Sequence, residues 1–512
     1  MQFFLTADLR IPREPNTVYL RHLEWDDWFK YATTYAVDYV DDSGERHQLG
    51  TTKVGKFDLR PAGKGAGVPG QSRSPDVPEA FTTLPKSFFS LGQDTDYYEA
   101  LTGLGDEVRD SILTGLRDIA LSPSLRAKAA AEDVTKVSLL RSVPMLTVQE
   151  QFARLAVGGV RLTAFDLKYK LKYITGHPSV SFSVIPESAP PTNIHVIVGR
   201  NGVGKSTFLN RLAAHHVKRG VGDEADEAVV SNLVSVSFSA FDAFEPLSAP
   251  QDRTKGITYH YVGLKRVGAP KDDADRVKGP RAIASEMTKS ARVCLRGARR
   301  TRWVRALRLL ESDPIFSAAG IADAADDVGS GTSEDEVLEN IGATFKLLSS
   351  GHKIVLLTIT RLVETVSEKS LVLLDEPEAH LHPPLLSAFV RALSDLLIDR
   401  NGIAIIATHS PVVLQEVPRS CVWKIDRIGE SGRISRPQIE TFGENVGTLT
   451  NEVFGLEVIS TGFHRLLREA AERHAHEGYE AALDALGGQV GTEGRSILRA
   501  LVDVLGRQNV GR

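Results

Sequence analysis

The stretch from Asn193 to Leu209 constrains this chain more than any other part of its sequence. An apolar run from Ile194 to Val198 is typical of a buried β-strand. The residues that follow, Gly199 to Ser206, fit the pattern G-x-x-x-x-G-K-[ST] in full. Apolar residues at helical spacing come next. The sequence therefore predicts a strand, a glycine-rich turn and a helix in direct succession.

The chemistry of such a turn is phosphate binding. Its glycines leave room for backbone N–H groups to surround phosphate oxygens, and the helix N-terminus adds the positive end of a dipole. Lys205 is expected to reach the β and γ phosphates of a nucleotide, and Ser206 to hold Mg²⁺. The alternative is a chance glycine-rich turn. The residues expected to contact the nucleotide here are Gly199, Arg200, Asn201, Gly202, Val203, Gly204, Lys205, Ser206 and Thr207.

A second apolar run, Leu371 to Leu374, ends in the two carboxylates of Asp375 and Glu376. Adjacent carboxylates beside phosphates are costly without a cation, so Asp375 is expected to bind Mg²⁺. Glu376 is expected to orient and polarise an attacking water. His380 and His382 follow at a spacing that suggests zinc, but no third ligand is near, and we interpret them as turn residues at a subunit contact.

Two further segments have polar residues where a regular element begins or ends. The strand pattern Gly402 to Thr408 leads to His409, which is placed to hydrogen-bond a γ-phosphate. Upstream, Leu348-Ser-Ser-Gly-His-Lys353 leads into a helix expected over residues 354–366. Small residues at a helix N-terminus expose N–H groups to an anion, so Ser349, Ser350 and Gly351 are further candidates for nucleotide binding.

A buried strand pattern from Leu233 runs into a polar turn at Asp242. Polar residues at such a strand end lie over a bound nucleotide in open α/β sheets. Ser239, Asp242 and Gln251 are therefore candidates to sense Mg²⁺ or water, and ordinary loop residues are an equal alternative.

From Asp252 to about Leu347 the chain becomes helical and rich in arginine. One interpretation is a surface that contacts the phosphate backbone of DNA or RNA. The alternatives are a solvated amphipathic helix, or a dock for the acidic segment Asp323 to Glu339. The helical pattern predicts that Arg302, Arg305 and Arg308 lie opposite the apolar residues. The nucleic-acid candidates are Lys289, Arg292, Arg296, Arg302, Arg305 and Arg308.

The remaining composition is ordinary for a globular chain of 512 residues with net charge −4, so any basic surface must be local. Two cysteines do not indicate a disulfide framework, and no apolar run reaches membrane-spanning length. A cytoplasmic protein without membrane contact is expected.

Residues 1–158 combine strand patterns, a hairpin turn at Asp41 to Gly44 and later helices. This combination predicts a mixed domain for packing or docking.

Taken together, the phosphate loop, LSSGHK, LLDEPEAHLHP and IIATHSP resemble the ABC-type ATPase superfamily over about residues 159–425. The sequences DEPEAHLHP and THSP look like the soluble branch: SMC-like repair ATPases, OLD-family ATPases, and ATPase subunits of antiphage systems such as the Septu protein PtuA. The resemblance implies ATP and Mg²⁺ as cofactors and the roles given above, with Lys205, Glu376 and His409 catalytic. Ser350 and His352 stand where transporters usually have Gly and Gln, and no Gln, Gln251 included, matches the position of the usual Mg²⁺-sensing glutamine convincingly.

The resemblance also implies an α/β fold with an ABC-type P-loop ATPase core. That core is expected over residues 159–512, with a helical arm inserted at about 252–347 and C-terminal helices at about 462–512. In this superfamily the signature loop, here Ser349 to Gly351, covers ATP bound to another subunit. Because the chain has one phosphate loop and one signature loop, a homodimer or higher even oligomer is expected.

The function that follows is an ATP-driven switch or clamp in an antiphage defence complex, with a separate nuclease or effector protein as its partner. Asp273 and Asp275 are the only tempting carboxylate pair in the arm, and no buried strand precedes them. The alternatives are an SMC-like ATPase of DNA repair or maintenance, a transporter ATPase subunit, and a scaffold that binds ATP without turnover.

Overall fold

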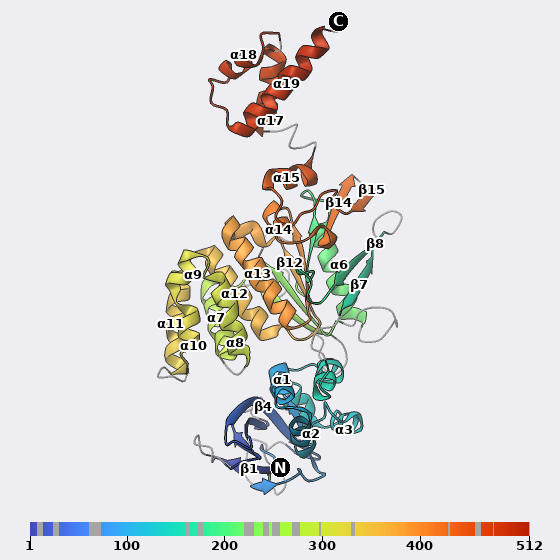
Figure 1. Cartoon of the computed structure of the whole chain (residues 1–512), viewed down its shortest axis with the longest axis vertical. Helices are drawn as coiled ribbons and strands as arrows, with labels where there is room; N and C mark the ends of the chain where they lie inside the picture. Colours follow the sequence, from blue (N-terminus) through green and yellow to red (C-terminus); the bar gives the residue numbers. More distant parts are fainter. Residues whose placement is uncertain are drawn as a thin grey trace.

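The computed structural model describes the chain except for residues 8–13, 24–29, 61–72, 160–163, 172–177, 220–229, 239–244, 248–256, 269–276, 296–297, 329–332, 429–430, 456–461, 475 and 511–512. Figure 1 shows an N-terminal part in blue, a central α/β part and a C-terminal group of helices in red. Separate clusters of buried apolar side chains lie in each of the three parts.

The N-terminal part is a six-stranded sheet followed by helices. The strand order is β5-β1-β2-β3-β4-β6, in which only β1 and β2 run parallel among the pairs of this sheet that the structure describes. The predicted turn at Asp41 to Gly44 joins β3 to β4, and Gly44 has a φ of 81° that favours glycine. The strands are β1 (Gln2–Thr6), β2 (Thr17–His22), β3 (Thr34–Val40), β4 (Arg46–Lys56), β5 (Ala80–Phe81) and β6 (Phe88–Gly92).

Short helices cover this sheet and enclose an aromatic core. Tyr97 and Tyr98 of the first helix are fully buried and pack edge to face, and Tyr98 also contacts Phe152. The α-helices are α1 (Thr95–Gly103), α2 (Asp106–Gly115), α3 (Pro123–Ala129), α4 (Met145–Thr147) and α5 (Ala153–Ala156), with π-helical turns at Thr135–Leu139 and Val148–Phe152. The part therefore has the mixed α and β composition expected from its sequence.

The central part is built on a seven-stranded sheet of order β11-β10-β12-β13-β9-β14-β15. All neighbours are parallel except β14 and β15. Its inner strands are buried and mainly apolar because both faces are covered, as is usual for parallel sheets. The strands are β9 (Ile194–Val198), β10 (Asn232–Ser237), β11 (Thr258–Gly263), β12 (Ser370–Asp375), β13 (Ile403–Thr408), β14 (Val422–Ile428) and β15 (Ser431–Ser435), with a hairpin of β7 (Phe165–Lys170) and β8 (Ser179–Val184) beside them.

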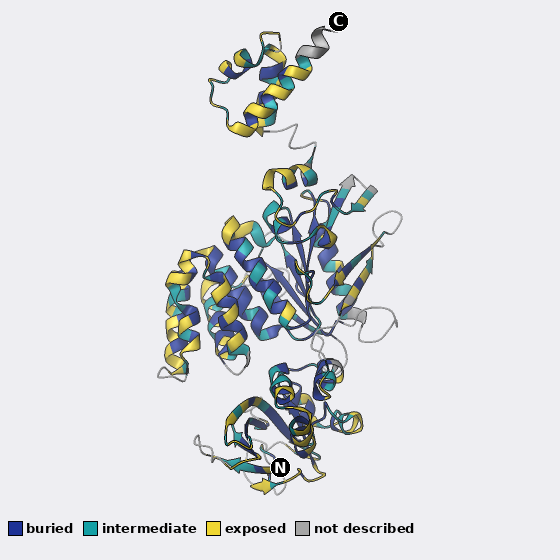
Figure 2. Cartoon of the chain, viewed as in Figure 1, coloured by how far each residue is buried: buried dark blue, intermediate teal, exposed yellow. Residues whose placement is uncertain are grey.

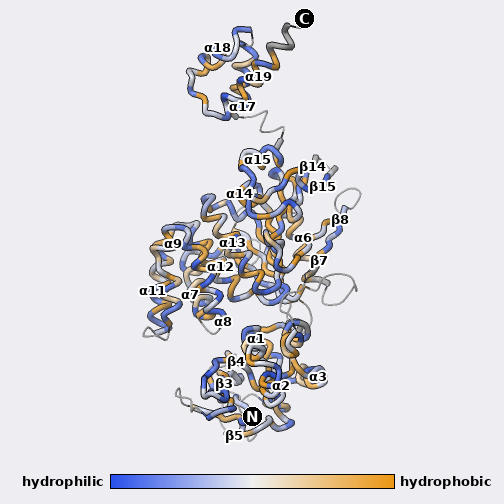
Figure 3. The backbone as a smooth tube through the Cα atoms, in the orientation of Figure 1, coloured by the Kyte–Doolittle hydropathy of each residue, from blue (hydrophilic) through white to orange (hydrophobic). Residues whose placement is uncertain are grey.

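Two separate cores lie on the two faces of this sheet. Alternate residues of β12 enter different cores: Leu371 and Leu373 pack with α6 (Lys205–Arg219), whereas Val372 and Leu374 pack with α12 (Ser350–Thr365) and α13 (Pro383–Asp399). Figure 2 shows the strands between these helices as buried, and Figure 3 shows the same region as hydrophobic. The helix that follows the phosphate loop therefore lies on the opposite face from α12 and α13.

The predicted helical arm is present between β11 and α12 and packs on the α12 face. Trp303 is fully buried there, and its indole N–H donates to Thr360 Oγ1 of α12 at 3.0 Å. The arm comprises α7 (Pro280–Cys294), α8 (Ala298–Leu310), α9 (Pro314–Ala319), α10 (Ile321–Asp326) and α11 (Glu334–Leu347). Ser333 and Glu336 form a capping box that begins α11.

After β13 the chain adds short helices and then a small helical group with its own core. α14 (Pro411–Gln415) and α15 (Val446–Phe454) lie beside the central sheet. In the C-terminal group, Leu467, Ala471 and Leu498 are buried against one another. Its helices are α17 (Gly462–His474), α18 (Tyr479–Asp484) and α19 (Thr492–Val510).

Two chain-wide properties bear on function. Cys294 and Cys421 are both buried and carry free thiols. Of the helices in the described ranges, none combines the length and the apolar character needed to cross a bilayer.

Candidate nucleotide site

Three neighbouring parallel strands, β12, β13 and β9, bring the predicted polar residues to one edge of the sheet. Lys205 Nζ lies 3.8 Å from Glu376 Oε1, and His409 Nδ1 lies 3.7 Å from the same oxygen. The carboxyl ends of parallel strands are where open α/β sheets bind ligands. The structure thus brings Lys205 close to Glu376 and His409, which lie more than 170 positions later in the sequence.

The phosphate loop has the backbone its glycines were expected to permit. Gly202 and Gly204 have φ values of 80° and 102°, a region that side chains other than glycine rarely adopt. Lys205 Nζ donates to the carbonyl oxygens of Gly199 at 3.0 Å and Arg200 at 3.1 Å, so the lysine is folded back over its own loop. Burial lowers the pKa of Lys205, and the charge of Glu376 opposes that shift.

The other loop residues divide between solvent and core. Asn201, Gly202 and Thr207 are exposed, and Arg200, Gly204 and Ser206 are half-buried. The Val203 side chain belongs to the core on the α6 face, so any contact of Val203 with a phosphate is through its backbone. Gly199 has a different role from the one its place in the motif suggests: a Cβ there would fall on the carbonyl oxygen of Ile425 in β14.

Glu376 follows directly after β12 and lies in the left-handed region, with φ 46° and ψ 58°. Its N–H donates to the carbonyl of Ala407 in β13 at 2.9 Å, which fixes the backbone in that conformation. Non-glycine residues in this region carry strain, and such strain gathers at functional sites. The unusual backbone directs the Glu376 carboxylate toward Lys205 and His409.

Glu378 is a residue of this site to which the sequence patterns gave no role. One oxygen, Oε1, accepts from Thr408 Oγ1 at 2.6 Å and from the His409 N–H at 2.8 Å. The same oxygen lies 3.2 Å from His409 Nδ1. Glu378 therefore ties the end of β13 to the turn η4 (Pro377–His380). The sequence feature that could have identified Glu378 is its place as the second Glu in Asp-Glu-Pro-Glu.

Asp375 and Ser206 supply the oxygen atoms that a magnesium site would use. Asp375 is the last residue of β12 and is half-buried, and its register neighbour in β13 is Ala407. A carboxylate and a hydroxyl are ligand types that Mg²⁺ prefers, together with phosphate oxygens and water. The donor set fits that ion, and the assignment of Ser206 and Asp375 to it stays a prediction.

The signature residues lie at the first turn of α12, which begins at Ser350 and not at 354 as the sequence suggested. Ser349 is the N-cap, and its hydroxyl accepts from the His352 N–H at 3.4 Å. A Cβ at Gly351 would fall on the carbonyl oxygen of His380, so only glycine allows this close approach. Because α12 lies on the face opposite α6, these residues do not belong to the Lys205 cluster.

Four arginines of the arm contact carboxylates of the same chain: Arg292, Arg302, Arg305 and Arg308. The helical pattern places Arg302 on the polar face, but its side chain does not point into solvent: it is 7% exposed and lies 3.0 Å from Asp94 of the N-terminal part. Periodicity assigned Arg302 to the polar face because it carries no information about a distant partner. The expected nucleic-acid contact stays a prediction for the set Lys289, Arg292, Arg296, Arg302, Arg305 and Arg308, of which Arg296 lies outside the described residues.

Two more arginines of the arm pair with the acidic segment, as one alternative anticipated. Arg308 lies 3.1 Å from Asp323, and Arg292 lies 3.1 Å from Asp335. Both contacts are substantially exposed, and surface pairs of this kind contribute little to stability. Ser239, Asp242 and Gln251, the candidates to sense Mg²⁺ or water, lie outside the described residues, as do Asp273 and Asp275.

Comparisons with known proteins agree with this geometry. A family described as "AAA domain, putative AbiEii toxin, Type IV TA system" matches residues 231–415, a range that contains α12, β12 and β13. The phosphate loop, the acidic end of β12 and this match define a P-loop ATPase domain of the AAA/ABC type. The expected fold class is confirmed: an α/β ABC-type P-loop ATPase core with a helical insertion and an N-terminal α+β domain.

The chain is also 39% identical over 516 residues to protein ea59 of Escherichia phage lambda, with 96% of this chain and 95% of that protein covered. It belongs to the family of protein ea59. Among solved structures, an inward-facing metal-chelate type ABC transporter is 16% identical, with 57% of this chain and 89% of that chain covered and a TM-score of 0.30. An ATP-binding cassette of an ABC transporter in its ADP conformation is 15% identical, with 58% and 98% covered and a TM-score of 0.27.

Proposed function

We propose that this chain binds ATP with Mg²⁺ and hydrolyses it to ADP and phosphate. The observation that carries the proposal is the meeting of Lys205, Glu376 and His409 at the carboxyl ends of adjacent strands, within 3.8 Å of a shared carboxylate oxygen. In a protein with a phosphate loop at the same edge, such a group has the parts that phosphoryl transfer to water requires.

Each residue has a distinct task in this proposal. Lys205 leaves the carbonyls of its loop to neutralise the β and γ phosphates, and the loop N–H groups hold the phosphate oxygens. Ser206 and Asp375 hold Mg²⁺, which when bound neutralises charge on the phosphates. The Glu376 carboxylate orients the attacking water and accepts its proton. His409, held by Glu378, donates a hydrogen bond to the γ-phosphate.

The test compares Glu376→Gln with the parent protein. The amide keeps the shape of the side chain but cannot accept a proton, so phosphate release should fall by about two orders of magnitude or more, with ATP binding retained. Glu480→Gln, in α18 of the C-terminal group, is the matched control and should release phosphate at the parental rate. Equal phosphate release from all three proteins would indicate a scaffold that does not turn ATP over.

We further propose that two copies of the chain complete each site. In one chain, the phosphate loop precedes a helix on one face of the sheet, while Ser349 and Gly351 begin a helix on the other face. This arrangement supports a homodimer or higher even oligomer in which ATP lies between the phosphate loop of one copy and the signature turn of another. The single copy of each motif in the chain supports the same conclusion.

Mixed oligomers test this arrangement. Lys205→Ala and Ser349→Arg should each be inactive alone, because each removes one half of every site. Mixing the two should restore roughly a quarter of the parental activity, since half of the dimers are then mixed and each has one intact composite site. No recovery on mixing, with both variants folded and able to associate, would show that the two motifs do not act across a subunit boundary.

At the level of the cell, we propose a cytoplasmic, nucleotide-driven switch of the soluble SMC/OLD-like branch that works with a separate nuclease or effector protein in defence against phages. ATP binding would close the oligomer and hydrolysis would open it. The support is indirect: sequence motifs similar to antiphage ATPase subunits, and a relative encoded by a phage, where competition with other phages gives such a switch a use.

Plating efficiency tests the defence role. Cells that express the chain with its neighbouring genes should reduce the plating of some phages, and the reduction should disappear with Glu376→Gln but not with Glu480→Gln. Unchanged plating across a broad phage panel would contradict the defence role, and DNA cleavage by the purified chain alone would contradict a separate nuclease. Neither result would affect the assignment of ATP hydrolysis.

A further inference from the structure

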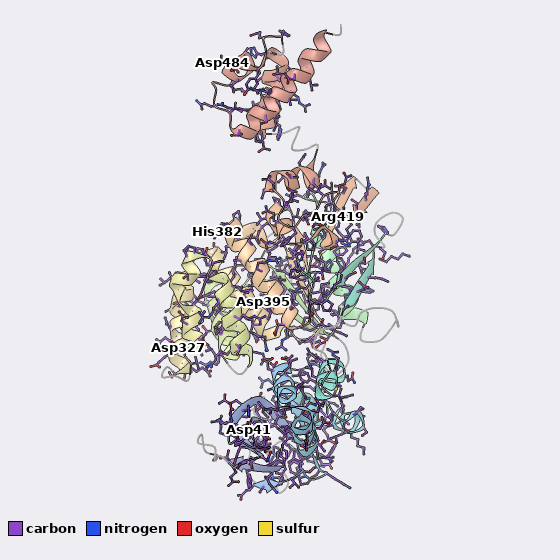
Figure 4. The ribbon with its side chains drawn as sticks, viewed as in Figure 1. Asp41, Asp327, His382, Asp395, Arg419 and Asp484 are labelled. Carbon is purple, nitrogen blue, oxygen red and sulfur yellow. The ribbon has the colours of Figure 1, made fainter. Side chains whose placement is uncertain are left out.

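Three segments of the chain meet at the buried carboxylate of Asp313. His352, in the first turn of α12, places Nε2 at 3.1 Å from Asp313 Oδ1. His382, the residue before α13, places Nε2 at 3.4 Å from Asp313 Oδ2. On the other side of its ring, His352 Nδ1 lies 2.6 Å from Ser349 Oγ. A continuous chain of polar contacts therefore runs from Asp313 through His352 to the signature serine. Figure 4 labels His382 at this position.

Asp313 is held as a carboxylate. It is the N-cap of α9, and Oδ1 accepts from the N–H groups of Ile315 at 2.9 Å and Phe316 at 3.3 Å. Burial by itself raises the pKa of Asp313, but the hydrogen bonds from His352 and these amides outweigh burial and hold the pKa below its ordinary value. An ionised carboxylate only accepts hydrogen bonds, so the proton of a neutral His352 belongs on Nε2.

This tautomer determines what Ser349 can do. With the proton on Nε2, Nδ1 has only a lone pair, and the 2.6 Å contact requires Ser349 to donate its hydroxyl hydrogen to His352. The Ser349 oxygen meanwhile accepts from the His352 N–H. A hydroxyl has one hydrogen, so Ser349 has none left for a phosphate oxygen, although its side chain is exposed.

A second proton on the imidazole reverses this arrangement. When Nδ1 carries a hydrogen, it donates to Ser349 Oγ, whose two lone pairs are then used by Nδ1 and by the His352 backbone. The hydroxyl hydrogen is free to turn outward and donate to an anion. The positive charge of the imidazolium, compensated by Asp313, adds a favourable field for a phosphate.

We propose that His352 is a positioning residue, oriented by Asp313, that makes Ser349 a hydrogen-bond donor to the γ-phosphate of ATP only when its imidazole takes up a proton. The proposal rests on the proposed function, in which Ser349 meets ATP bound to another copy. The step is a proton transfer from a hydronium ion of the solvent to His352 Nδ1: an O–H bond breaks, an N–H bond forms, water is released, and the Ser349 hydroxyl rotates, with no bond between heavy atoms changed.

The surroundings of His352 identify the charges that act on it. Among the described residues, its ring contacts Asp313 and Phe316 at the start of α9, Ser349 of its own turn and His382 before α13. His352 is 5% exposed, whereas the His382 side chain is 51% exposed. His382 shares the Asp313 carboxylate and contacts the ring of His352, but no hydrogen bond joins it to Ser349 among the described residues, so it is the natural control.

The experiment measures ATP-dependent association against pH. The parent for this series is Glu376→Gln, which we expect to bind ATP without turning it over. Its self-association is measured by sedimentation with Mg²⁺-ATP from pH 6 to 8.5. Protonation of the imidazole favours the engaged state, so association should be strong at pH 6 and should weaken toward pH 8.5, by at most about tenfold per pH unit for each linked proton. Association without nucleotide is the baseline.

Three further substitutions, each added to Glu376→Gln, test which residues cause the dependence of self-association on pH. His352→Asn replaces the imidazole with an amide that takes up no proton between pH 6 and 8.5, so its association should depend little on pH. His382→Gln should retain the parental slope. Ser349→Ala, at an exposed position, should associate weakly at all pH values and lose the slope. A parental slope in His352→Asn or in Ser349→Ala, or a flat profile in His382→Gln, would overturn the proposal.

The failure of this inference can be distinguished from failure of the proposed function. If the wild-type chain releases phosphate and Glu376→Gln self-associates in the presence of ATP, the proposals of ATP hydrolysis and of a dimer remain supported. This holds whatever the dependence of self-association on pH. The wild-type enzyme gives a second readout: raising the pH should increase KM for ATP with little change in kcat, and His352→Asn should remove that increase. His409 is the same in both proteins, so its effect on KM cancels in the comparison. If His352→Asn fails to fold, His352→Gln and Ser349→Ala decide by the same criteria.

Discussion

At the scale of single residues, Glu376 combines the central carboxylate of the candidate site with a strained, left-handed backbone. Lys205, Glu376 and His409 were found because each follows an apolar strand pattern, and the structure brings them together. The left-handed backbone of Glu376 could not be predicted, since it depends on a hydrogen bond to Ala407 in another strand. The role of Glu378 also depends on contacts across the sheet edge.

The backbone strain at Glu376 leads to a prediction about stability. A non-glycine residue at φ 46° costs about 1–2 kcal/mol, and the greater freedom of glycine in the unfolded chain offsets part of that. Glu376→Gly should therefore be more stable than Glu376→Gln by roughly 1 kcal/mol, while both are inactive. Urea unfolding of the two variants measures the difference. A glycine variant less stable than the glutamine variant would show that the conformation is not strained.

Asp118 provides a pH prediction for the N-terminal part. Its carboxylate is buried and accepts from the Gly92 N–H at 3.0 Å and the Ala120 N–H at 2.7 Å. Burial nevertheless raises the pKa of Asp118 to about 6 from an ordinary value of 3.8. Between these two values the folded chain binds a proton that the unfolded chain does not, so this residue increases stability as pH falls.

The gain from Asp118 should reach about 3 kcal/mol when the pH has dropped below both values, and it should be absent above pH 7. Other carboxylates titrate in the same range, so the measurement is the difference in unfolding free energy between wild type and Asp118→Asn. That difference should shift in favour of wild type from pH 7.5 to pH 4.5. A difference that stays constant, or shifts the other way, would contradict the raised pKa.

At the scale of elements, strands were easier to predict than helical faces. β9, β10, β12 and β13 are buried and mainly apolar because helices cover both faces of a parallel sheet, and that pattern is visible in the sequence. The start of α12 was placed too late because Ser350 and Gly351 are poor helix formers that the Ser349 cap and a close contact with His380 hold in the first turn. Neither contact is apparent from local sequence.

The packing of β9 against β14 leads to a prediction for the phosphate loop. A Cβ at Gly199 would fall on the Ile425 carbonyl, a backbone atom that cannot move aside cheaply. Gly199→Ala should lower the free energy of unfolding by about 1–3 kcal/mol, as overpacking generally does. Gly103→Ala, at a helical position with open space around it, is the control and should be neutral or slightly stabilising. Equal unfolding midpoints for the two variants would contradict the close contact.

At the scale of the whole molecule, one buried ionic cluster joins the N-terminal part to the ATPase core. Asp94, the N-cap of α1, contacts Arg302 of α8 at 3.0 Å and Arg400, which ends α13, at 3.1 Å. Burial by itself raises the pKa of Asp94, but the guanidinium groups of Arg400 and Arg302 outweigh it and hold the pKa well below its ordinary value. The sequence could not predict this joint, because its members are 208 and 306 positions apart.

Removal of Asp94 should therefore weaken the joint severely. Asp94→Ala leaves two buried guanidinium groups without their shared partner, which generally costs about 3–5 kcal/mol. Asp395→Ala is the matched control, since Asp395 also pairs with an arginine of α8, Arg305 at 2.6 Å, but in an exposed position where such pairs contribute at most about 1 kcal/mol. Figure 4 labels Asp395. Urea unfolding and limited proteolysis between the two parts would measure both effects, and equal losses would contradict a buried joint.

The burial of both native cysteines has a practical consequence for watching this molecule move. Burial raises the pKa of the Cys421 thiol to about 11, and the Cys294 thiol is raised further, so neither offers a reactive thiolate near neutral pH. A cysteine introduced on an exposed helix can then be labelled with a maleimide dye while the native pair stays in place. Dyes on two copies would report subunit approach by energy transfer in an otherwise unaltered chain.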